Sequence, residues 1–238
     1  MKIRIINPDY GVSPEAMAER CAMLRPFVGP DVALSMVCLT QTRVEIDSAA
    51  DVALAGPEIL RLARQAEADG CDAVVLYCFS DPAIDACRET LSIPVIGGAQ
   101  ASLLLAPHVT RRTGVLLADA QRIPEKELFL RTLGLAPERI QAIGAISFGG
   151  RDIWQYRDDA LRELERAGRA MIEQDRVQCL ILGCLSFLGL AAPLSEALHI
   201  PVLDPAGAAV AVAEAVVRLG LKTSRKAYPG KSPEGLEK

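Results

Sequence analysis

The chain of 238 residues is long enough to bury one large α/β core or two smaller ones, so its stability does not require disulfides. Half of the residues are hydrophobic and few are aromatic, which excludes a disordered chain and favours helices packed on parallel strands. The net charge of −4 arises from interspersed acidic and basic residues, which excludes a nucleic-acid-binding face and a basic membrane-binding surface. The expected partners are a small-molecule substrate and copies of the same chain.

The first predicted element is a strand over residues 2–6, where basic residues alternate with isoleucines before a turn at Asn7 and Pro8. This pattern does not fit a secretory leader, so we expect a cytoplasmic protein. Two stretches without formal charge, residues 90–110 and 177–195, are interrupted by proline and glycine. They are therefore expected to form strand, turn and helix, and no membrane span is predicted.

The following elements alternate between helix and strand. The first half continues with predicted helices over residues 14–24 and 57–69 and a strand over residues 32–39. The second half has strands over residues 113–117 and 140–148 and helices over residues 124–133 and 160–174. Alternation of this kind predicts parallel sheets with helical crossovers.

An internal repeat joins the two halves. Segments 72–106 and 178–213 each contain an apolar strand that ends in a cysteine, a turn with a short helix, an Ile-Pro-Val run and an Ala-rich helix. The distance from Cys78 to Pro94 is 16 residues and that from Cys184 to Pro201 is 17. The sequence thus predicts an α/β fold of two pseudo-symmetric lobes, each a parallel sheet flanked by helices. The predicted first lobe comprises residues 1–106 and 207–238, with a returning C-terminal helix, and the second comprises residues 107–206.

Ligands of open parallel sheets bind beyond the carboxyl ends of the strands, where Cys78 and Cys184 are both expected. We expect the two sulfurs to approach one cleft between the lobes, together with Asn7 and Ala118, which follow the first strand of each half. One thiolate could remove a proton from a carbon next to a carbonyl while the other thiol returns a proton on the opposite face. Such a pair would invert the carbon.

The turns after the two cysteines supply further candidates. Backbone N–H groups over residues 79–82 and 185–188 could stabilise a thiolate and an enolate oxygen. The side chains of these turns that are candidate substrate contacts are Phe79, Ser80, Asp81, Leu185 and Ser186. The two serines are equally well explained as helix caps. Asp204 and Pro205 predict the start of the last helix.

No cofactor or metal is expected. The chain has seven cysteines without a C-x-x-C spacing and only two histidines, which argues against both a disulfide framework and a zinc site. The lysines avoid the predicted strand ends, so a pyridoxal Schiff base has no anchor. The remaining five cysteines are interpreted as buried, unreactive thiols.

Several of these motifs resemble the Asp/Glu/hydantoin racemase superfamily, in particular its hydantoin and allantoin racemase branch. The matching runs are Ile6-Asn7-Pro8, Cys78-Phe79-Ser80-Asp81-Pro82, Gly183-Cys184, Asp204-Pro205 and Leu219-Gly220-Leu221. The resemblance implies a cofactor-independent racemase with two pseudo-symmetric lobes, the two thiols as acid and base, and assembly into homo-oligomers.

The sequence departs from this branch where a substrate is expected. Asp9-Tyr10 replaces Asn-Thr, Arg43-Val44 replaces Gly-Pro, and Ala118-Asp119 stands where threonine is common. Tyr10 and Arg43 are therefore candidate substrate contacts, and Arg43 could bind a carboxylate that a hydantoin lacks. Two alternatives stay open: a cis-trans isomerase with a cysteine nucleophile, similar to maleate isomerase, and a catalytically silent small-molecule binding protein.

Overall fold

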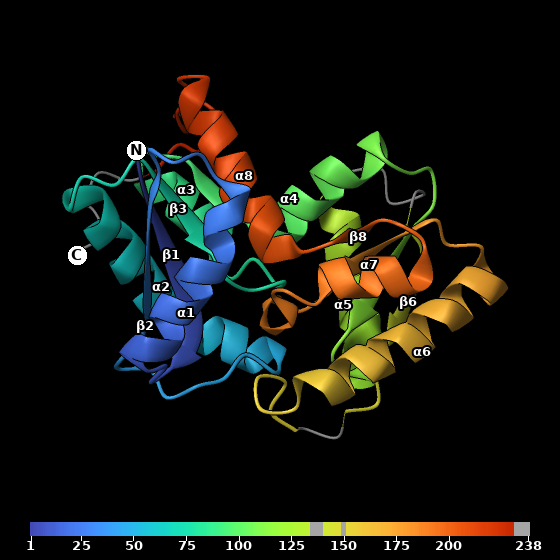
Figure 1. Ribbon diagram of the computed structural model, residues 1–238. Coiled ribbons are helices and arrows are strands. Elements are labelled where there is room, and N and C mark those ends of the chain that lie inside the picture. Colours follow the sequence, from blue (N-terminus) through green and yellow to red (C-terminus); the bar gives the residue numbers. More distant parts are fainter. Residues whose placement is uncertain (134–139, 149–150, 231–238) are drawn as a thin grey trace. The chain divides into compact units, whose positions relative to one another are not determined.

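The computed structural model describes residues 1–133, 140–148 and 151–230 (Figure 1). The chain divides into two compact units, the first formed by residues 1–98 with 209–238 and the second by residues 99–208. Each unit contains a parallel four-stranded sheet flanked by helices. The predicted α/β fold class is confirmed.

The sheet of the first unit has the strand order β2-β1-β3-β4. Its strands are β1 (Lys2–Tyr10), β2 (Ala33–Leu39), β3 (Ala73–Leu76) and β4 (Val95–Gly97). The helical elements of this unit are α1 (Pro14–Leu24), η1 (Arg25–Phe27), α2 (Ala49–Ala68), α3 (Ile84–Thr90) and most of α8 (Pro205–Arg218). One face of α2 packs Ala55, Ile59 and Ala63 against strand residues such as Ile6 and Leu76, all fully or almost fully buried. This apolar stripe anchors α2 on the sheet.

The second unit repeats this topology with the order β6-β5-β7-β8. Its strands are β5 (Thr113–Leu117), β6 (Ile140–Ala145), β7 (Cys179–Leu182) and β8 (Val202–Leu203). Its helical elements are α4 (Gly98–Leu105), η2 (Ala106–His108), η3 (Ala120–Arg122), α5 (Ile123–Thr132), α6 (Arg157–Asp175), η5 (Leu185–Phe187) and α7 (Ala191–Leu198). Within this unit α6 contacts β5, β6 and α7, and its buried residues Leu164 and Met171 join the core (Figure 1). The order of strands shows that the two halves are structural repeats.

One helix begins earlier than the sequence pattern predicts. The helix expected from residue 57 starts at Ala49 instead, and Pro57 lies inside it. The start is set by Ser48, whose hydroxyl accepts a hydrogen bond from the backbone N–H of Asp51, at 3.1 Å. Asp51 in turn accepts from the Ser48 hydroxyl at 2.6 Å, so a reciprocal cap outweighs the tendency of proline to begin helices.

The C-terminal part of α8 is bound within the first unit. Glu214 accepts hydrogen bonds from the backbone N–H of Gly29, and Arg218 forms an ion pair of 2.6 Å with Asp31. The beginning of α8 follows Asp204, which confirms the predicted start of the last helix. Among the residues that the structure describes, no helix combines the length and the apolar character needed to cross a bilayer.

Candidate active site

Asn7 and Cys78 lie just beyond the paired part of β1 and β3 in the first unit. Ile6 of β1 pairs with Leu76 of β3, and the N–H of Tyr77 donates to the carbonyl of Ile6 at 2.8 Å. Asn7, which still belongs to β1, and Cys78 therefore follow the last paired residues of these two strands, toward the carboxyl edge of the sheet. The chain leaves β1 toward β2 on one side and β3 toward β4 on the other. Such a switch point is where open parallel sheets bind their ligands.

Cys184 occupies the same place in the second unit. Leu116 of β5 pairs with Leu182 of β7, and the N–H of Gly183 donates to the carbonyl of Leu116 at 2.6 Å. A Cβ on Gly183 would lie 2.5 Å from a methyl carbon of Leu117 and 2.9 Å from the same carbonyl oxygen, so this close approach requires glycine. Cys184 follows directly, as Cys78 follows Tyr77.

The register makes Leu117 the equivalent of Asn7. Ala118, which was expected to match Asn7, corresponds instead to Pro8. Leu117 is 2% exposed, so the first unit presents an amide beside its cysteine where the second presents an apolar side chain. The two halves thus have the same backbone arrangement at this edge, but only the first has a polar side chain beside its cysteine.

The turns after the two cysteines are alike. The N–H of Asp81 donates to the carbonyl of Cys78, and the N–H of Phe187 donates to the carbonyl of Cys184, each at 3.2 Å. Two residues farther along, Ala83 and Gly189 both have left-handed backbone conformations. In the first turn, the N–H of Ser80 also approaches the sulfur of Cys78 at 3.5 Å. A donor in this position stabilises a thiolate.

Exposure separates the two candidate cysteines from most of the others. Cys78 and Cys184 are half-buried, whereas Cys38, Cys71, Cys87 and Cys179 are buried. Burial raises the pKa of Cys87 to about 12, although nearby Arg88 opposes the shift, and raises that of Cys179 to about 11. Cys21 is half-buried, and burial raises its pKa as well. These environments favour the interpretation of Cys21, Cys87 and Cys179 as inert thiols.

Asn7 is fully buried, and only one of the two polar atoms of its side-chain amide has a hydrogen-bond partner. Its Oδ1 accepts a hydrogen bond of 3.1 Å from the backbone N–H of Asp9. Its Nδ2 is buried and has no hydrogen-bond acceptor among the residues that the structure describes. A buried donor without an acceptor costs about 1–3 kcal/mol, so its retention calls for an explanation outside folding.

The two segments that depart from the racemase pattern contact each other. The N–H of Tyr10 donates to the carbonyl of Val44 at 2.9 Å, and the guanidinium of Arg43 lies 5.5 Å from the centre of the Tyr10 ring. Tyr10 is 37% exposed and Arg43 is also exposed. Asp9 precedes Tyr10, and burial raises the pKa of its carboxyl, despite a hydrogen bond from the Ile46 N–H and the attraction of Arg20. Asp9 and Tyr10 belong to β1, which thus continues beyond its predicted end at residue 6.

The other predicted contacts fall into two groups by exposure. Phe79, Asp81 and Leu185 are 3%, 3% and 2% exposed, while Ser80, Ser186 and Ala118 are half-buried. The structure brings Asn7, Phe79, Ser80 and Asp81 to the edge that carries Cys78, and Ala118, Leu185 and Ser186 to the edge that carries Cys184.

Two buried polar groups near these edges make contacts that the sequence did not predict. Arg20 of α1 is 9% exposed and lies 5.8 Å from the ring centre of Tyr77, the residue before Cys78. Asp204 bonds to the turn that follows Cys184, through the N–H of Gly189 at 2.9 Å. An arginine in a helical pattern is normally expected on the surface, and an aspartate before proline is normally expected to cap a helix. Nothing in the neighbouring sequence therefore predicts the contacts of Arg20 and Asp204.

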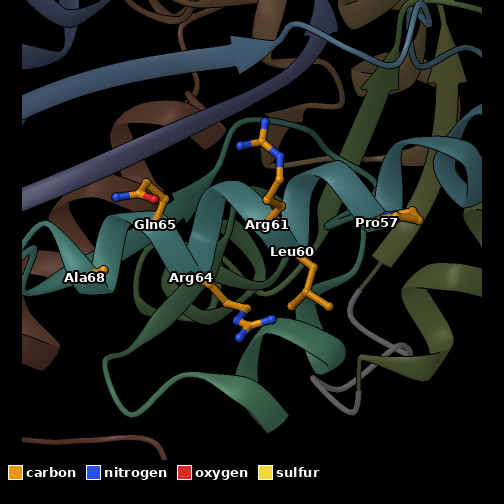
Figure 2. A pocket seen from close by; sticks show the side chains of 6 residues that line it. All are labelled: Pro57, Leu60, Arg61, Arg64, Gln65 and Ala68. Carbon is orange, nitrogen blue, oxygen red and sulfur yellow. The ribbon is translucent and has the colours of Figure 1, made fainter. Parts of the chain in front are cut away.

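A surface hollow of about 400 Å³ lies elsewhere in the first unit, over the exposed side of α2 (Figure 2). Its lining residues are Pro57, Leu60, Arg61, Arg64, Gln65 and Ala68. Figure 2 shows Arg61 and Arg64 directed away from each other, so they do not converge on one anion. The hollow contains no strand-end residue and is not the candidate site. Within the described part of the chain, no three histidine, cysteine or acidic side chains gather as metal ligands.

Comparison with known proteins gives one consistent result. The family model described as "Asp/Glu/Hydantoin racemase" matches residues 3–213. The hydantoin racemase of Rhizobium meliloti is 33% identical over 232 residues, which cover 96% of this chain and 95% of that protein. The allantoin racemase from Klebsiella pneumoniae has a TM-score of 0.86 at 28% identity, covering 94% of this chain and 90% of that one. The allantoin racemase from Pseudomonas fluorescens, at 23% identity, has a TM-score of 0.87 and shares the fold, with 98% of each chain covered.

Proposed function

Because the chain belongs to the Asp/Glu/hydantoin racemase family, we propose that it is a cofactor-independent racemase or epimerase of the hydantoin or allantoin type. Its substrate would carry a stereogenic carbon next to a carbonyl, whose hydrogen is acidic enough for removal by a side chain. The relatives named as hydantoin and allantoin racemases support this substrate class. In broader terms, the proposed substrate is an amino acid or a derivative of one.

In this proposal Cys78 and Cys184 are the acid and the base. The observation that carries it is their equivalent position: each is the second residue after the third strand of its unit, at the carboxyl edge, and each is half-buried. One thiolate removes the proton from one face of the carbon and leaves an enolate, and the other thiol delivers a proton to the opposite face. The roles exchange for the other enantiomer.

Neighbouring groups would serve the proton transfers in different ways. The Ser80 N–H beside the sulfur of Cys78 would stabilise the thiolate. The unsatisfied Nδ2 of Asn7 would donate to the substrate carbonyl, where negative charge develops as the proton leaves. Phe79, Leu185, Ala118 and the hydroxyls of Ser80 and Ser186 are proposed as further substrate contacts.

The exposed pair of Tyr10 and Arg43 is proposed to select the substrate. Their contact places a cation on an aromatic ring beside the carboxyl end of β1. A guanidinium binds anions and an aromatic ring stacks on planar groups, so this pair favours a substrate with an anionic or planar substituent over a hydantoin ring without a substituent. Assembly into homo-oligomers and a cytoplasmic location stay predictions from the sequence.

Solvent exchange tests the proposed function. Single enantiomers of 5-substituted hydantoins, allantoin and acidic amino acids are incubated with the protein in deuterated water. A racemase is expected to abolish the optical rotation of its substrate while one deuterium enters at the inverted carbon. Tight binding without deuterium uptake would instead indicate a silent binding protein. A covalent adduct on one cysteine with cis-trans conversion of an unsaturated diacid would indicate an isomerase of the maleate type.

A further inference from the structure

Asp204 ties the cysteine turn of the second unit to the helix that follows β8. Its Oδ2 accepts from the N–H of Gly189 at 2.9 Å, and Gly189 belongs to the turn that follows Cys184. Its Oδ1 accepts from the N–H groups of Ala206 and Gly207 at 2.9 and 3.2 Å, in the first turn of α8. The side chain is buried, at 6% exposure for the residue. One carboxylate thus fixes two segments at once.

The first unit has glycine at the position equivalent to Asp204. Val95 and Ile96 of β4 pair with β3 as Val202 and Leu203 of β8 pair with β7, so Gly97 corresponds to Asp204. The missing carboxylate comes from the cysteine turn itself. A Cβ built on Gly97 would lie 2.2 Å from Cγ and 2.4 Å from both carboxylate oxygens of Asp81.

The two units thus exchange the position of the carboxylate: where one unit has an aspartate, the other has a residue without a carboxylate. Asp81 is the third residue after Cys78, and the third residue after Cys184 is Phe187, which is fully buried. Each unit therefore has one buried carboxylate at the start of the helix after its fourth strand. In the first unit it is attached to the turn, and in the second it is attached to the strand end.

The conformation of the first turn shows that Asp81 is held in place. Asp81 has a φ of 43° and Ala83 a φ of 58°, in the left-handed region that non-glycine residues avoid. Such residues persist only where their surroundings impose the conformation. Burial also works against Asp204: it raises the pKa of this carboxyl, although three backbone N–H groups and Arg157 favour the charged form. A simple exposed helix cap would incur neither cost.

We propose that Asp81 and Asp204 are positioning residues, each of which holds the turn that orients one of the two cysteines. The inference rests on the proposed function for its catalytic meaning, since it assigns the two carboxylates to the two proposed acid and base groups. Asp81 is thereby assigned to the support of Cys78 and not to direct contact with the substrate.

Alkylation of the thiols tests the proposal without any substrate. The rate of carbamidomethylation by iodoacetamide is followed from pH 6 to 10 for each cysteine by peptide mass spectrometry, in the wild type, D81N and D204N. We expect D81N to slow the reaction of Cys78 near neutral pH by about five-fold or more, the effect of losing the hydrogen bond from the Ser80 N–H to the sulfur when the turn shifts, with Cys184 unchanged. D204N is expected to have the reverse selectivity. Cys21, half-buried on α1, is the internal control.

The outcome that would overturn the proposal is an unchanged profile for both cysteines in both variants, or equal changes at both cysteines in either variant. A general loss of packing would give the second result. If racemisation itself is never detected, the proposed function fails while the alkylation result still decides whether each carboxylate orients its cysteine.

A relocated carboxylate provides the sharpest control. D81G removes the side chain and leaves a residue suited to positive φ, and G97D supplies a carboxylate from the strand end, as in the second unit. We expect D81G alone to show the defect at Cys78 and the double variant D81G/G97D to return the Cys78 profile to within about three-fold of the wild type, as recovery of one hydrogen bond allows. A folded double variant that reacts like D81G would contradict the exchange. If D81G does not fold by circular dichroism, D81N decides.

Discussion

The backbone N–H of Ser80 lies 3.5 Å from the sulfur of Cys78, inside a turn that the N–H of Asp81 closes onto the carbonyl of Cys78. The donor belongs to the backbone, so its position depends on the turn and not on the identity of the side chain at residue 80. This relationship links the local fold of the turn to the chemistry proposed for the thiol.

The Ser80→Ala variant should therefore retain most of its activity. Because the backbone donor stays in place, we expect kcat to fall by no more than about three-fold, whereas KM rises because the proposed contact between the hydroxyl and the substrate is lost. The same substitution at Ser186 is the matched control in the second unit. A fall of more than a hundred-fold in S80A alone would show that the hydroxyl carries the function.

Asn7→Leu should separate function from stability. The substitution copies the equivalent residue Leu117 and removes the unsatisfied Nδ2 donor. We expect kcat/KM to fall by about 10- to 100-fold, because the donor to the developing oxyanion is lost, while the midpoint of urea unfolding stays constant or rises. Loss of stability in parallel with activity would indicate that Asn7 serves folding through its bond to Asp9.

Glu58 should make the free energy of unfolding depend on pH in the acid range. Burial alone would raise its pKa, but the N–H groups of Thr40, Gln41 and Thr42 outweigh burial and lower the pKa to about 2. Because the folded-state pKa lies below the unfolded value, the carboxylate stabilises the protein above about pH 4.5 and this stabilisation is lost as the pH falls toward 2. We expect Glu58→Gln to lower the free energy of unfolding by about 2–3 kcal/mol at pH 7.

Urea unfolding at pH 7, 5, 4 and 3 checks this expectation. The difference between the wild type and E58Q should shrink at the acid end of the series, and E89Q, at an exposed site, should match the wild type throughout. A difference that is constant with pH would show that the charge of Glu58 is not what stabilises the loop.

Pro57→Ala should stabilise the protein. Pro57 lies inside α2, where proline lacks the N–H of a helical hydrogen bond. We expect a gain of about 1–2 kcal/mol in the free energy of unfolding, since recovered helix propensity exceeds the lost rigidity of the unfolded chain. Pro14→Ala, at the first residue of α1, is the control and should give no gain. Equal effects at both sites would contradict this account of α2.

The repeat, the strand alternation and the strand-end position of Cys78 and Cys184 could be predicted because each depends on local pattern. The start of α2 could not be recognised from Pro57, although Ser48 and Asp51 carried a capping signal three residues apart. The equivalence of Asn7 with Leu117 needed the register of paired strands. The contact between Asp81 and Gly97 joins two segments through space, and glycine gives no sign of what fills the volume beside it.

Isotope exchange in variants that each lack one cysteine tests the two-thiol mechanism most directly. Each enantiomer of the substrate is incubated separately in deuterated water with C78S, C184S and the control C21S, and both deuterium content and optical purity are measured. We predict that C21S behaves as the wild type, while C78S and C184S each lose racemisation by at least about a thousand-fold, as expected when a general acid or base is removed. Full racemisation by both C78S and C184S would contradict the mechanism.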